Sequence, residues 1–191
     1  MEQMISFREL DERCQRMGVL MPSLQAYEIA KALDHPLRFL VFGLGNDSGM
    51  WAELNQGGQT VFLEDDPVWM ERVSRQHPSL ETYAVNYGTA LLEWRDILQA
   101  PDKLELELPE QVKQTNWDLI LVDGPAGYND STPGRMKSIY MASRLIKPQG
   151  IIFLHDAERE VENVYSRKYL RGNFLDMRTP DGLVLRRYFV E

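Results

Sequence analysis

Cysteine is almost absent from this chain of 191 residues, in which Cys14 is the single example. One cysteine cannot form an intramolecular disulfide or a cysteine metal cluster, so we expect a reducing compartment and a partly buried Cys14. No apolar run approaches the roughly 18 residues of a membrane span. The segment Met1-Glu2-Gln3-Met4 also lacks the charged-then-apolar profile of a signal peptide. These absences predict a soluble, cytoplasmic protein without a membrane partner.

Positive charge is also scarce, since 21 Lys and Arg stand against 29 Asp and Glu, for a net charge of −8. This balance argues against a protein that neutralises phosphates, so we expect no nucleic-acid partner. The charge is unevenly spread: residues 1–132 hold 10 Lys and Arg against 22 Asp and Glu, whereas residues 133–191 hold 11 against 7. We expect the basic part to complete a substrate cleft, so an anionic substrate is compatible with the overall acidity.

What the sequence does contain is an alternation of short apolar runs and amphipathic stretches. Runs of strand-forming residues occupy 37–42, 59–63, 80–85, 117–122 and 150–154. Helical patterns lie at about 47–57, 67–76, 89–98, 133–146 and 158–170. Strands separated by helices predict an α/β fold with a mostly parallel sheet covered on both faces. Pro180-Asp181-Gly182 separates strand-like residues 177–179 from 183–190, which predicts a C-terminal antiparallel hairpin.

Two further segments lie outside this alternation. Residues 1–36 contain a helical pattern from Ser23 to Leu33, with Ser23 expected as the N-cap. We expect residues 1–36 to form a helical cap segment and residues 37–191 to form the α/β domain. Residues 100–114 contain two prolines and four carboxylates and predict a solvated excursion whose charges serve solubility.

The first predicted strand runs into a turn with two closely spaced glycines, Gly43-Leu44-Gly45-Asn46-Asp47-Ser48-Gly49. Glycine lets the backbone turn sharply and approach a ligand at the N-terminus of the following helix. Glu64 ends the second strand, where an acidic residue accepts hydrogen bonds from the ribose hydroxyls of an adenosyl cofactor. Together they predict a nucleotide-type ligand, and both nicotinamide dinucleotides and S-adenosylmethionine fit.

Three features favour S-adenosylmethionine. Leu145-Ile146-Lys147-Pro148-Gln149-Gly150 resembles the Leu-x-Pro-Gly-Gly turn of Rossmann-like methyltransferases, with Gln149 in place of the first glycine. The C-terminal hairpin resembles the reversed final strand of the same class. S-adenosylmethionine has no pyrophosphate, so Ser48 at the third glycine position of a dinucleotide motif matters less.

A wider set of motifs closely resembles the glucuronoxylan 4-O-methyltransferase family of polysaccharide biosynthesis proteins. The likeness covers roughly residues 20–190, and one departure is Asn46, where plant members usually have histidine. The matched segments are residues 39–48, 50–51, 54–55, 57–67, 117–118, 122–125, 127–128, 133–136, 139–140, 155–156, 161–162 and 165–166. The resemblance implies the Rossmann-like fold of class I methyltransferases, S-adenosylmethionine as cofactor and O-methylation as the reaction.

Residue roles follow from this methyltransferase interpretation. The cofactor site would use the first turn, the ends of the second and third strands and their neighbours. In that site Gly43, Leu44 and Gly45 line the methionine portion, Asp47 and Ser48 offer polar contacts, Glu64 holds the ribose, and Asp65 and Tyr87 border the adenine. Trp51 and Trp69 are expected to pack against the sheet.

Methyl transfer to a hydroxyl requires an aligned acceptor and a base that removes its proton. Asp123 and the pair His155-Asp156 follow adjacent central strands, where ligands bind in open α/β sheets, so we expect them to be the catalytic residues. The same carboxylates could chelate a divalent cation. For the acceptor we expect contacts from Arg135, whose guanidinium can grip a carboxylate, and from Tyr128, with Lys137 and Arg159 nearby.

We therefore expect an S-adenosylmethionine-dependent O-methyltransferase that acts on a carboxylate-bearing saccharide of the uronic acid type or on a small molecule. Several alternatives stay open. They are N- or carboxyl-methylation of a specialised metabolite, a nicotinamide-dependent oxidoreductase, and a non-catalytic adenosyl-binding module. The acceptor, the metal and the oligomeric state have no clear signal in the sequence.

Overall fold

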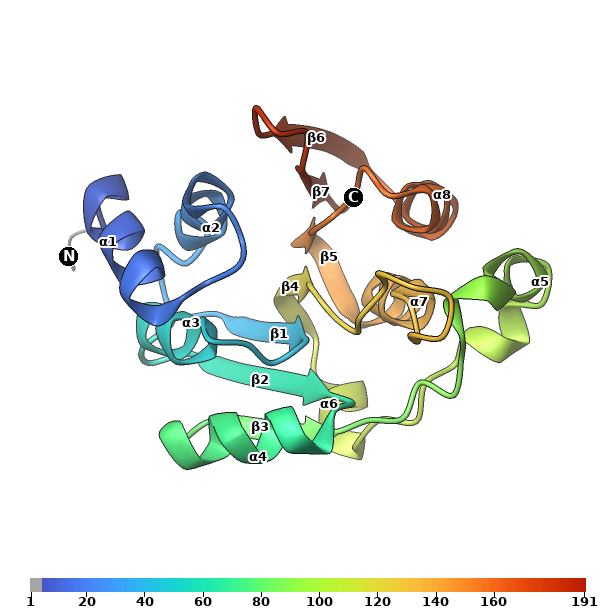
Figure 1. The fold of residues 1–191 in the computed structure, drawn as a ribbon, viewed down its shortest axis with the longest axis horizontal. Helices are drawn as coiled ribbons and strands as arrows, with labels where there is room; N and C mark the ends of the chain where they lie inside the picture. The colour runs from blue at the N-terminus through green and yellow to red at the C-terminus, as the bar shows by residue number, and fades with distance from the viewer. Residues whose placement is uncertain (1–4) are drawn as a thin grey trace.

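The computed structural model describes residues 5–191 and places seven strands in one twisted sheet (Figure 1). The strands are β1 (Arg38–Phe42), β2 (Gln59–Glu64), β3 (Glu81–Ala84), β4 (Trp117–Val122), β5 (Ile146–Leu154), β6 (Asn173–Arg178) and β7 (Val184–Phe189). Their order is β3-β2-β1-β4-β5-β7-β6, with β1 to β5 parallel and β7 antiparallel to both of its neighbours. The predicted α/β fold with a C-terminal antiparallel hairpin is confirmed.

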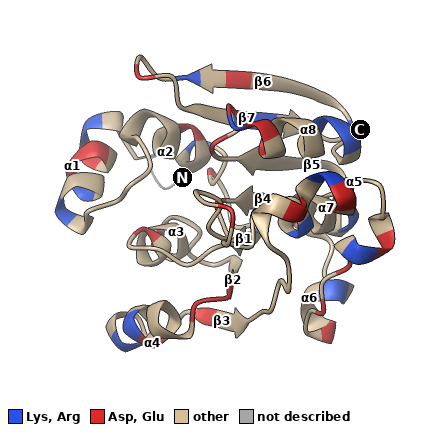
Figure 2. Ribbon diagram, turned by 45° about the vertical axis from the view of Figure 1, so that its right-hand side comes forward, with Lys and Arg blue, Asp and Glu red and all other residues tan. Residues whose placement is uncertain are grey.

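Helices fill the connections between the strands. The α-helices are α1 (Phe7–Met17), α2 (Ser23–Ala30), α3 (Ser48–Leu54), α4 (Pro67–Gln76), α5 (Trp94–Leu98), α6 (Glu110–Gln114), α7 (Met136–Leu145) and α8 (Glu160–Tyr169). Two 3₁₀ turns, η1 (Leu91–Glu93) and η2 (Pro101–Leu104), flank α5. Charged residues belong mainly to these helices, to β6 and to the loops (Figure 2). None of the helices described is long and apolar enough to span a bilayer.

The two faces of the sheet are covered by different helices because successive side chains of a strand point to opposite faces. In β1, Phe39 and Val41 pack with α1 to α4, whereas Leu40 and Phe42 pack with α5 to α8. The two sets of helices lie on opposite sides of the strands in Figure 1. This sandwich holds the carboxyl ends of the parallel strands at one edge, where the connecting loops meet.

The amino-terminal segment differs in detail from the expectation. Helix α1 was not predicted; Ser6 caps it by accepting a hydrogen bond from the Glu9 amide, and it buries Cys14, as expected for that residue. Helix α2 begins at Ser23 and has Pro22 as its N-cap, so the prediction of Ser23 as a side-chain cap is wrong. Both helices share a core with one face of the sheet. The division of the chain at residue 36 stays a prediction, and the signal-peptide argument rests on residues 1–4, which lie outside the described part.

The predicted solvated excursion at residues 100–114 is wrong in part. Leu104, Leu106 and Leu108 are buried in the core, while the intervening Glu105 and Glu107 are exposed. An apolar residue at every second position lets an extended chain bury one side and solvate the other. The sequence shows that alternation, but a prediction based on the number of carboxylates overlooks it.

Candidate active site

A cavity of about 710 Å³ opens at the carboxyl ends of β1, β2, β4 and β5. The sheet order places it where the connections from β1 and β4 diverge, which is the usual ligand position in open α/β sheets. Most of the residues predicted for the site line this cavity. They are Gly43, Leu44, Gly45, Asp47, Glu64, Asp65, Asp123, Tyr128, Arg135, His155 and Asp156.

The floor of the cavity is formed by two glycines that follow neighbouring strands. Gly43 has φ +112°, and a Cβ placed on it would lie 3.1 Å from the Gly124 amide nitrogen. A Cβ on Gly124 would lie 2.7 Å from the Gly43 Cα atom. The two turns therefore approach each other as bare backbone, which leaves the space above them to a ligand.

Glu64 joins the first two turns of the site. Its Oε2 atom accepts the Leu44 amide at 2.8 Å, and its Oε1 atom accepts the amides of Asp65 and Asp66. Burial raises the pKa of Glu64, and these amide hydrogen bonds oppose the rise. Because a carboxylate accepts about four hydrogen bonds, Glu64 keeps capacity for one ligand hydroxyl rather than the two expected.

Asp47 and Ser48 at the start of α3 have different environments. Asp47 lines the cavity, accepts a hydrogen bond from Trp51 Nε1 at 2.9 Å, and has a pKa raised to about 6 by burial and by the charge of Asp123. The Ser48 hydroxyl accepts the Gly45 amide at 2.8 Å and does not line the cavity. Ser48 therefore fixes the turn rather than offering the predicted ligand contact.

The two tryptophans differ in their environment. Trp51 is fully buried, as expected for a packing residue. Trp69 donates its Nε1 hydrogen to the Leu44 carbonyl and also lines the cavity.

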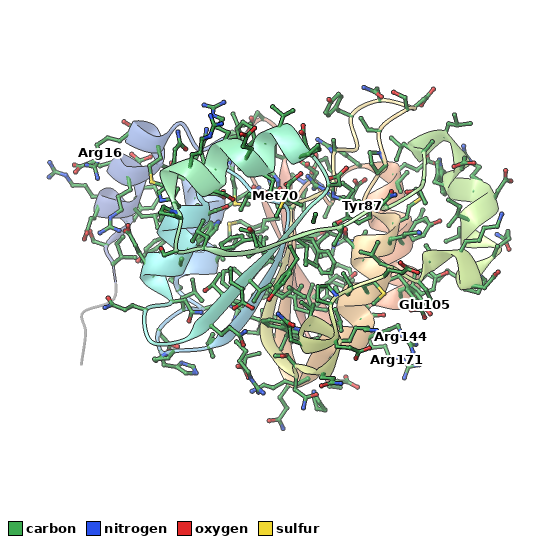
Figure 3. All side chains as sticks on the ribbon, turned by 90° about the horizontal axis from the view of Figure 1, so that it is seen from below. Arg16, Met70, Tyr87, Glu105, Arg144 and Arg171 are labelled. Atoms are coloured by element: carbon green, nitrogen blue, oxygen red, sulfur yellow. The ribbon has the colours of Figure 1, made fainter. Side chains whose placement is uncertain are left out.

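Tyr87 and Lys137 lie outside the cavity lining. The Tyr87 side chain is buried in the core against α7, and its hydroxyl accepts a hydrogen bond from Ser138 at 3.1 Å. Figure 3 labels Tyr87 within the packed side chains of the molecule. The placement of Tyr87 at the adenine is therefore not supported, because the chain turns its ring inward after β3. Lys137 is half-buried, and burial lowers its pKa.

The three residues predicted to be catalytic lie together. His155 Nδ1 is 2.8 Å from Asp123 Oδ1 and 3.7 Å from Asp156 Oδ2. Burial would raise the pKa of Asp123, but the hydrogen bond and charge of His155 hold it below its usual value. Burial would lower the pKa of His155, but Asp123 and Asp156 raise it. Asp156 itself adopts φ +58°, a left-handed conformation uncommon outside glycine.

Arg135 contacts all three residues of this cluster, Asp123, His155 and Asp156. Its guanidinium donates to the His155 carbonyl at 2.7 Å, lies 2.9 Å from Asp156 and 3.3 Å from Asp123, and also reaches the Pro125 carbonyl. Its side chain is 6% exposed, so these contacts occupy a guanidinium that was expected to grip the acceptor. Arg159 also pairs with Asp156 at 2.9 Å but is 35% exposed at the cavity. Arg159 is therefore the cation better placed to meet an acceptor carboxylate.

The charge of the cavity differs from the expected basic cleft. Six carboxylates line it against two guanidinium groups. Other cations of residues 133–191 lie elsewhere, and Arg144 and Arg171 line a separate cavity with Glu105. Figure 3 labels these three residues near one another. The positive part of the sequence thus does not concentrate its charge at the site.

The cluster does not suit a divalent cation. Arg135 contacts both Asp123 and Asp156, so a guanidinium already compensates the carboxylates that would bind the ion. Within residues 5–191, no group of three His, Cys, Asp or Glu side chains has the arrangement of a metal site. The hypothesis of a carboxylate-bound metal is therefore not supported.

A loop that sequence reasoning missed completes the cavity. Val19, Leu20 and Met21, between α1 and α2, line it, and Leu20 is 96% exposed. The Asn46 side chain donates to the Gly18 carbonyl at 3.0 Å and ties this loop to the first turn. The available signal was Gly18 followed by three apolar residues and a proline, a pattern that ends one helix before another begins.

Comparison with known proteins identifies relatives of this chain. The family described as IRX15/IRX15L/GXM matches residues 24–106 and 98–183. Glucuronoxylan 4-O-methyltransferase 2 of Arabidopsis thaliana is 40% identical over an aligned length of 161, and the match covers 73% of this chain and 56% of that protein. Arabinogalactan O-methyltransferase 2, also of Arabidopsis thaliana, is 42% identical over an aligned length of 160, and the match covers 71% of this chain and 55% of that protein. The chain spans a little more than half the length of these relatives.

Solved structures with a similar fold include methyltransferases. A TehB-like SAM-dependent methyltransferase from Corynebacterium glutamicum has a TM-score of 0.56 at 13% identity, over 97% of this chain and 98% of that one. A methyltransferase from Pyrococcus furiosus has a TM-score of 0.55 at 15% identity, over 87% and 81%. These likenesses establish the Rossmann-like methyltransferase fold, and the family match together with the two plant relatives establishes more: this chain belongs to the IRX15/IRX15L/GXM family.

Proposed function

We propose that this protein transfers a methyl group from S-adenosylmethionine to a hydroxyl oxygen of a uronic-acid-containing saccharide. One observation carries the proposal. His155 lines the cavity with Nδ1 held by Asp123, while its buried Nε2 atom has no hydrogen-bond partner among the described residues. A histidine oriented in this way can accept a proton at Nε2.

The chain's own residues fit S-adenosylmethionine at the other half of the cavity. The bare backbone at Gly43 and Gly124 leaves room for a ligand, and Glu64 retains one acceptor position for a ribose hydroxyl. The excess of carboxylates in the cavity favours a cation by charge complementarity. When bound, S-adenosylmethionine supplies a methyl group on a positively charged sulfur.

His155 and its partners then supply the acid–base chemistry. Neutral His155 would take the proton of the acceptor hydroxyl at Nε2 as that oxygen bonds to the methyl group, while the methyl–sulfur bond breaks and neutral S-adenosylhomocysteine leaves. Asp123 holds the Nδ1 hydrogen and stabilises the positive charge that develops on the ring, in the manner of an orienting carboxylate. Arg135 fixes both Asp123 and the His155 carbonyl, and therefore acts as a positioning residue.

A uronic acid acceptor is supported by the cation and by the relatives. Arg159 is partly exposed at the cavity, and a guanidinium can bind a carboxylate through two parallel hydrogen bonds. The exposed Tyr128 offers an aromatic surface beside it. Two relatives are named for O-methylation of glucuronoxylan and of arabinogalactan.

Calorimetry and mass spectrometry test the proposal together. We expect S-adenosylmethionine and S-adenosylhomocysteine to bind and NAD not to bind. Incubation with S-adenosylmethionine and a glucuronic-acid-containing oligosaccharide should add the mass of one methyl group to the sugar. Binding of NAD alone, or cofactor binding without methylation of any saccharide, would overturn the proposal.

A further inference from the structure

A second groove, of about 700 Å³, adjoins the cavity and shares Gly127, Tyr128 and Arg159 with it. We call it the side groove. Its other walls come from η1 and the start of α5 on one side and from the start of α8 on the other. A ligand whose reacting end sits in the cavity can therefore continue past Tyr128 and Arg159 into the side groove.

Glu162 supplies a buried polar group at the side groove. Its side chain lines the groove, the residue is 1% exposed, and its Oε1 atom has no hydrogen-bond partner among the described residues. A Cβ added to Gly127 would lie 3.3 Å from that oxygen, so a side chain at this position would crowd it. A buried acceptor without a partner is unfavourable, and a hydroxyl donated by a ligand would satisfy it.

Apolar and aromatic surface lies beside this acceptor. Leu92 is 65% exposed and Tyr128 is 76% exposed, although both are large apolar or aromatic side chains. The Trp94 ring also lines the groove and carries the Arg95 guanidinium 4.2 Å from its centroid. Exposed apolar side chains around a few polar groups are typical of a ligand site. A sugar ring matches them, since it presents C–H faces and hydroxyl edges.

The charges of the side groove favour a neutral ligand. Asp130, Glu160 and Glu162 stand against Arg95 and Arg159. Arg95 pairs with Glu160 at 3.2 Å, so that cation is compensated, and Arg159 stands at the junction with the cavity. Beyond that junction the remaining cation of the groove lining, Arg95, is already paired with Glu160, so a second carboxylate-bearing sugar would lack a counter-charge there.

We propose that the side groove binds neutral sugar residues linked to the uronic acid whose hydroxyl is methylated. This inference rests on the proposed function. The uronate carboxylate contacts Arg159 at the junction, and the next sugar packs against the exposed Leu92 and Tyr128 and donates a hydroxyl to Glu162. The protein therefore selects an oligosaccharide over the free uronic acid.

Steady-state kinetics with two acceptors tests this inference. The acceptors are the methyl glycoside of glucuronic acid and an oligosaccharide of glucuronoxylan in which that acid is linked to neutral sugars. We expect the wild-type kcat/KM to be about tenfold higher for the oligosaccharide, as one or two good contacts provide. Leu92→Ser and Glu162→Gln should each reduce this preference severalfold through KM of the oligosaccharide. Leu175→Ser changes a residue that is also 65% exposed, but on β6, and should retain the preference.

The outcomes separate the inference from the proposed function. Methylation of both acceptors with equal kcat/KM in the wild type would overturn the inference and leave the proposed function standing. An unchanged preference in both Leu92→Ser and Glu162→Gln would also overturn it. Failure to methylate either acceptor, with cofactor bound, would instead overturn the proposed function. Circular dichroism of each variant shows whether it is folded, and the two substitutions serve as independent probes of the groove.

Discussion

His155 Nδ1 lies 2.8 Å from Asp123 Oδ1, and the carbonyl of His155 accepts a hydrogen bond from Arg135, which also contacts Asp123. Asp123 thus holds the His155 imidazole and Arg135 holds the His155 backbone carbonyl, and these two residues also contact each other. Because β4 and β5 are adjacent and parallel, their carboxyl ends bring Asp123 and His155 to the same place. The pair therefore follows directly from the topology of the sheet.

The pH dependence of methylation should report the ionisation of His155. A histidine base works when neutral, and Asp123 and Asp156 outweigh burial and raise its pKa above the ordinary 6.5. We expect kcat/KM to fall on the acid side, with its midpoint above pH 6.5. In Asp123→Asn the hydrogen-bonded charge is lost, so the midpoint should move to lower pH as the maximal rate falls. An identical midpoint in both proteins would contradict this coupling.

Asp47→Asn should stabilise the protein at neutral pH. The pKa of Asp47 is raised from 3.8 to about 6, so the folded state favours the protonated carboxyl. The resulting stabilisation is complete below pH 3.8 and is lost as the pH rises through 6. Asparagine stays neutral and still accepts from Trp51 Nε1. In urea denaturation we expect a gain on the order of 2 kcal/mol at pH 7.5 and less than about 1 kcal/mol at pH 4. Equal gains at both pH values would argue against a buried, ionised Asp47.

Arg135→Lys and Arg159→Lys form a matched pair of substitutions. One ammonium group cannot reproduce the contacts of Arg135 with two carboxylates and two carbonyls, so that variant should lose about 3 kcal/mol of unfolding free energy. Arg159 is one-third exposed and bonds one carboxylate and one carbonyl, so its variant should lose less than about 1 kcal/mol. Thermal and urea unfolding measure both, and similar losses would contradict the central role given to Arg135.

Gln149→Gly should raise stability. Gln149 has φ +64°, a left-handed conformation that costs a side-chain-bearing residue roughly 1–2 kcal/mol, partly offset by the extra unfolded-state entropy of glycine. We expect a net gain of about 0.5–1 kcal/mol. Gln149→Ala keeps the Cβ atom and should show no such gain. A glycine variant no more stable than the alanine variant would contradict this explanation.

Short-range sequence patterns predicted most of the fold. The strand-like runs, the glycine turn after residue 42 and the Pro-Asp-Gly turn each depend on neighbouring residues, and strands alternating with helices indicate a parallel sheet. The order of the strands in the sheet was not predicted. The strand boundaries shifted most at two strands. β5 begins at Ile146 rather than at residue 150, because helix α7 ends at Leu145, and β6 begins at Asn173 rather than at residue 177. The leucines at 104–108 occupy every second position, a period of two that indicates an extended segment with one buried side.

The parts of the site that sequence reasoning missed depend on direction and on distant contacts. Tyr87 follows β3 as expected, but its ring turns into the core toward Ser138. Arg135 is buried against the carboxylates and Arg159 is partly exposed at the cavity, so the acceptor contact predicted for Arg135 suits Arg159 better. Leu20 reaches the cavity from a loop that precedes the first strand by many residues. Tertiary packing decides each of these features: the sequence after Gly18 signals a loop, but not the place of that loop at the cavity.

The most direct measurement is methyl transfer by His155→Gln at saturating S-adenosylmethionine and saccharide. Glutamine keeps a polar side chain of similar size but cannot accept the proton as imidazole does, so kcat should fall roughly 10²–10⁴-fold. Calorimetry should show cofactor affinity within about threefold of the wild type, since the Gly43 turn and Glu64 are untouched. Undiminished methylation by this variant would contradict the assignment of His155 as the base.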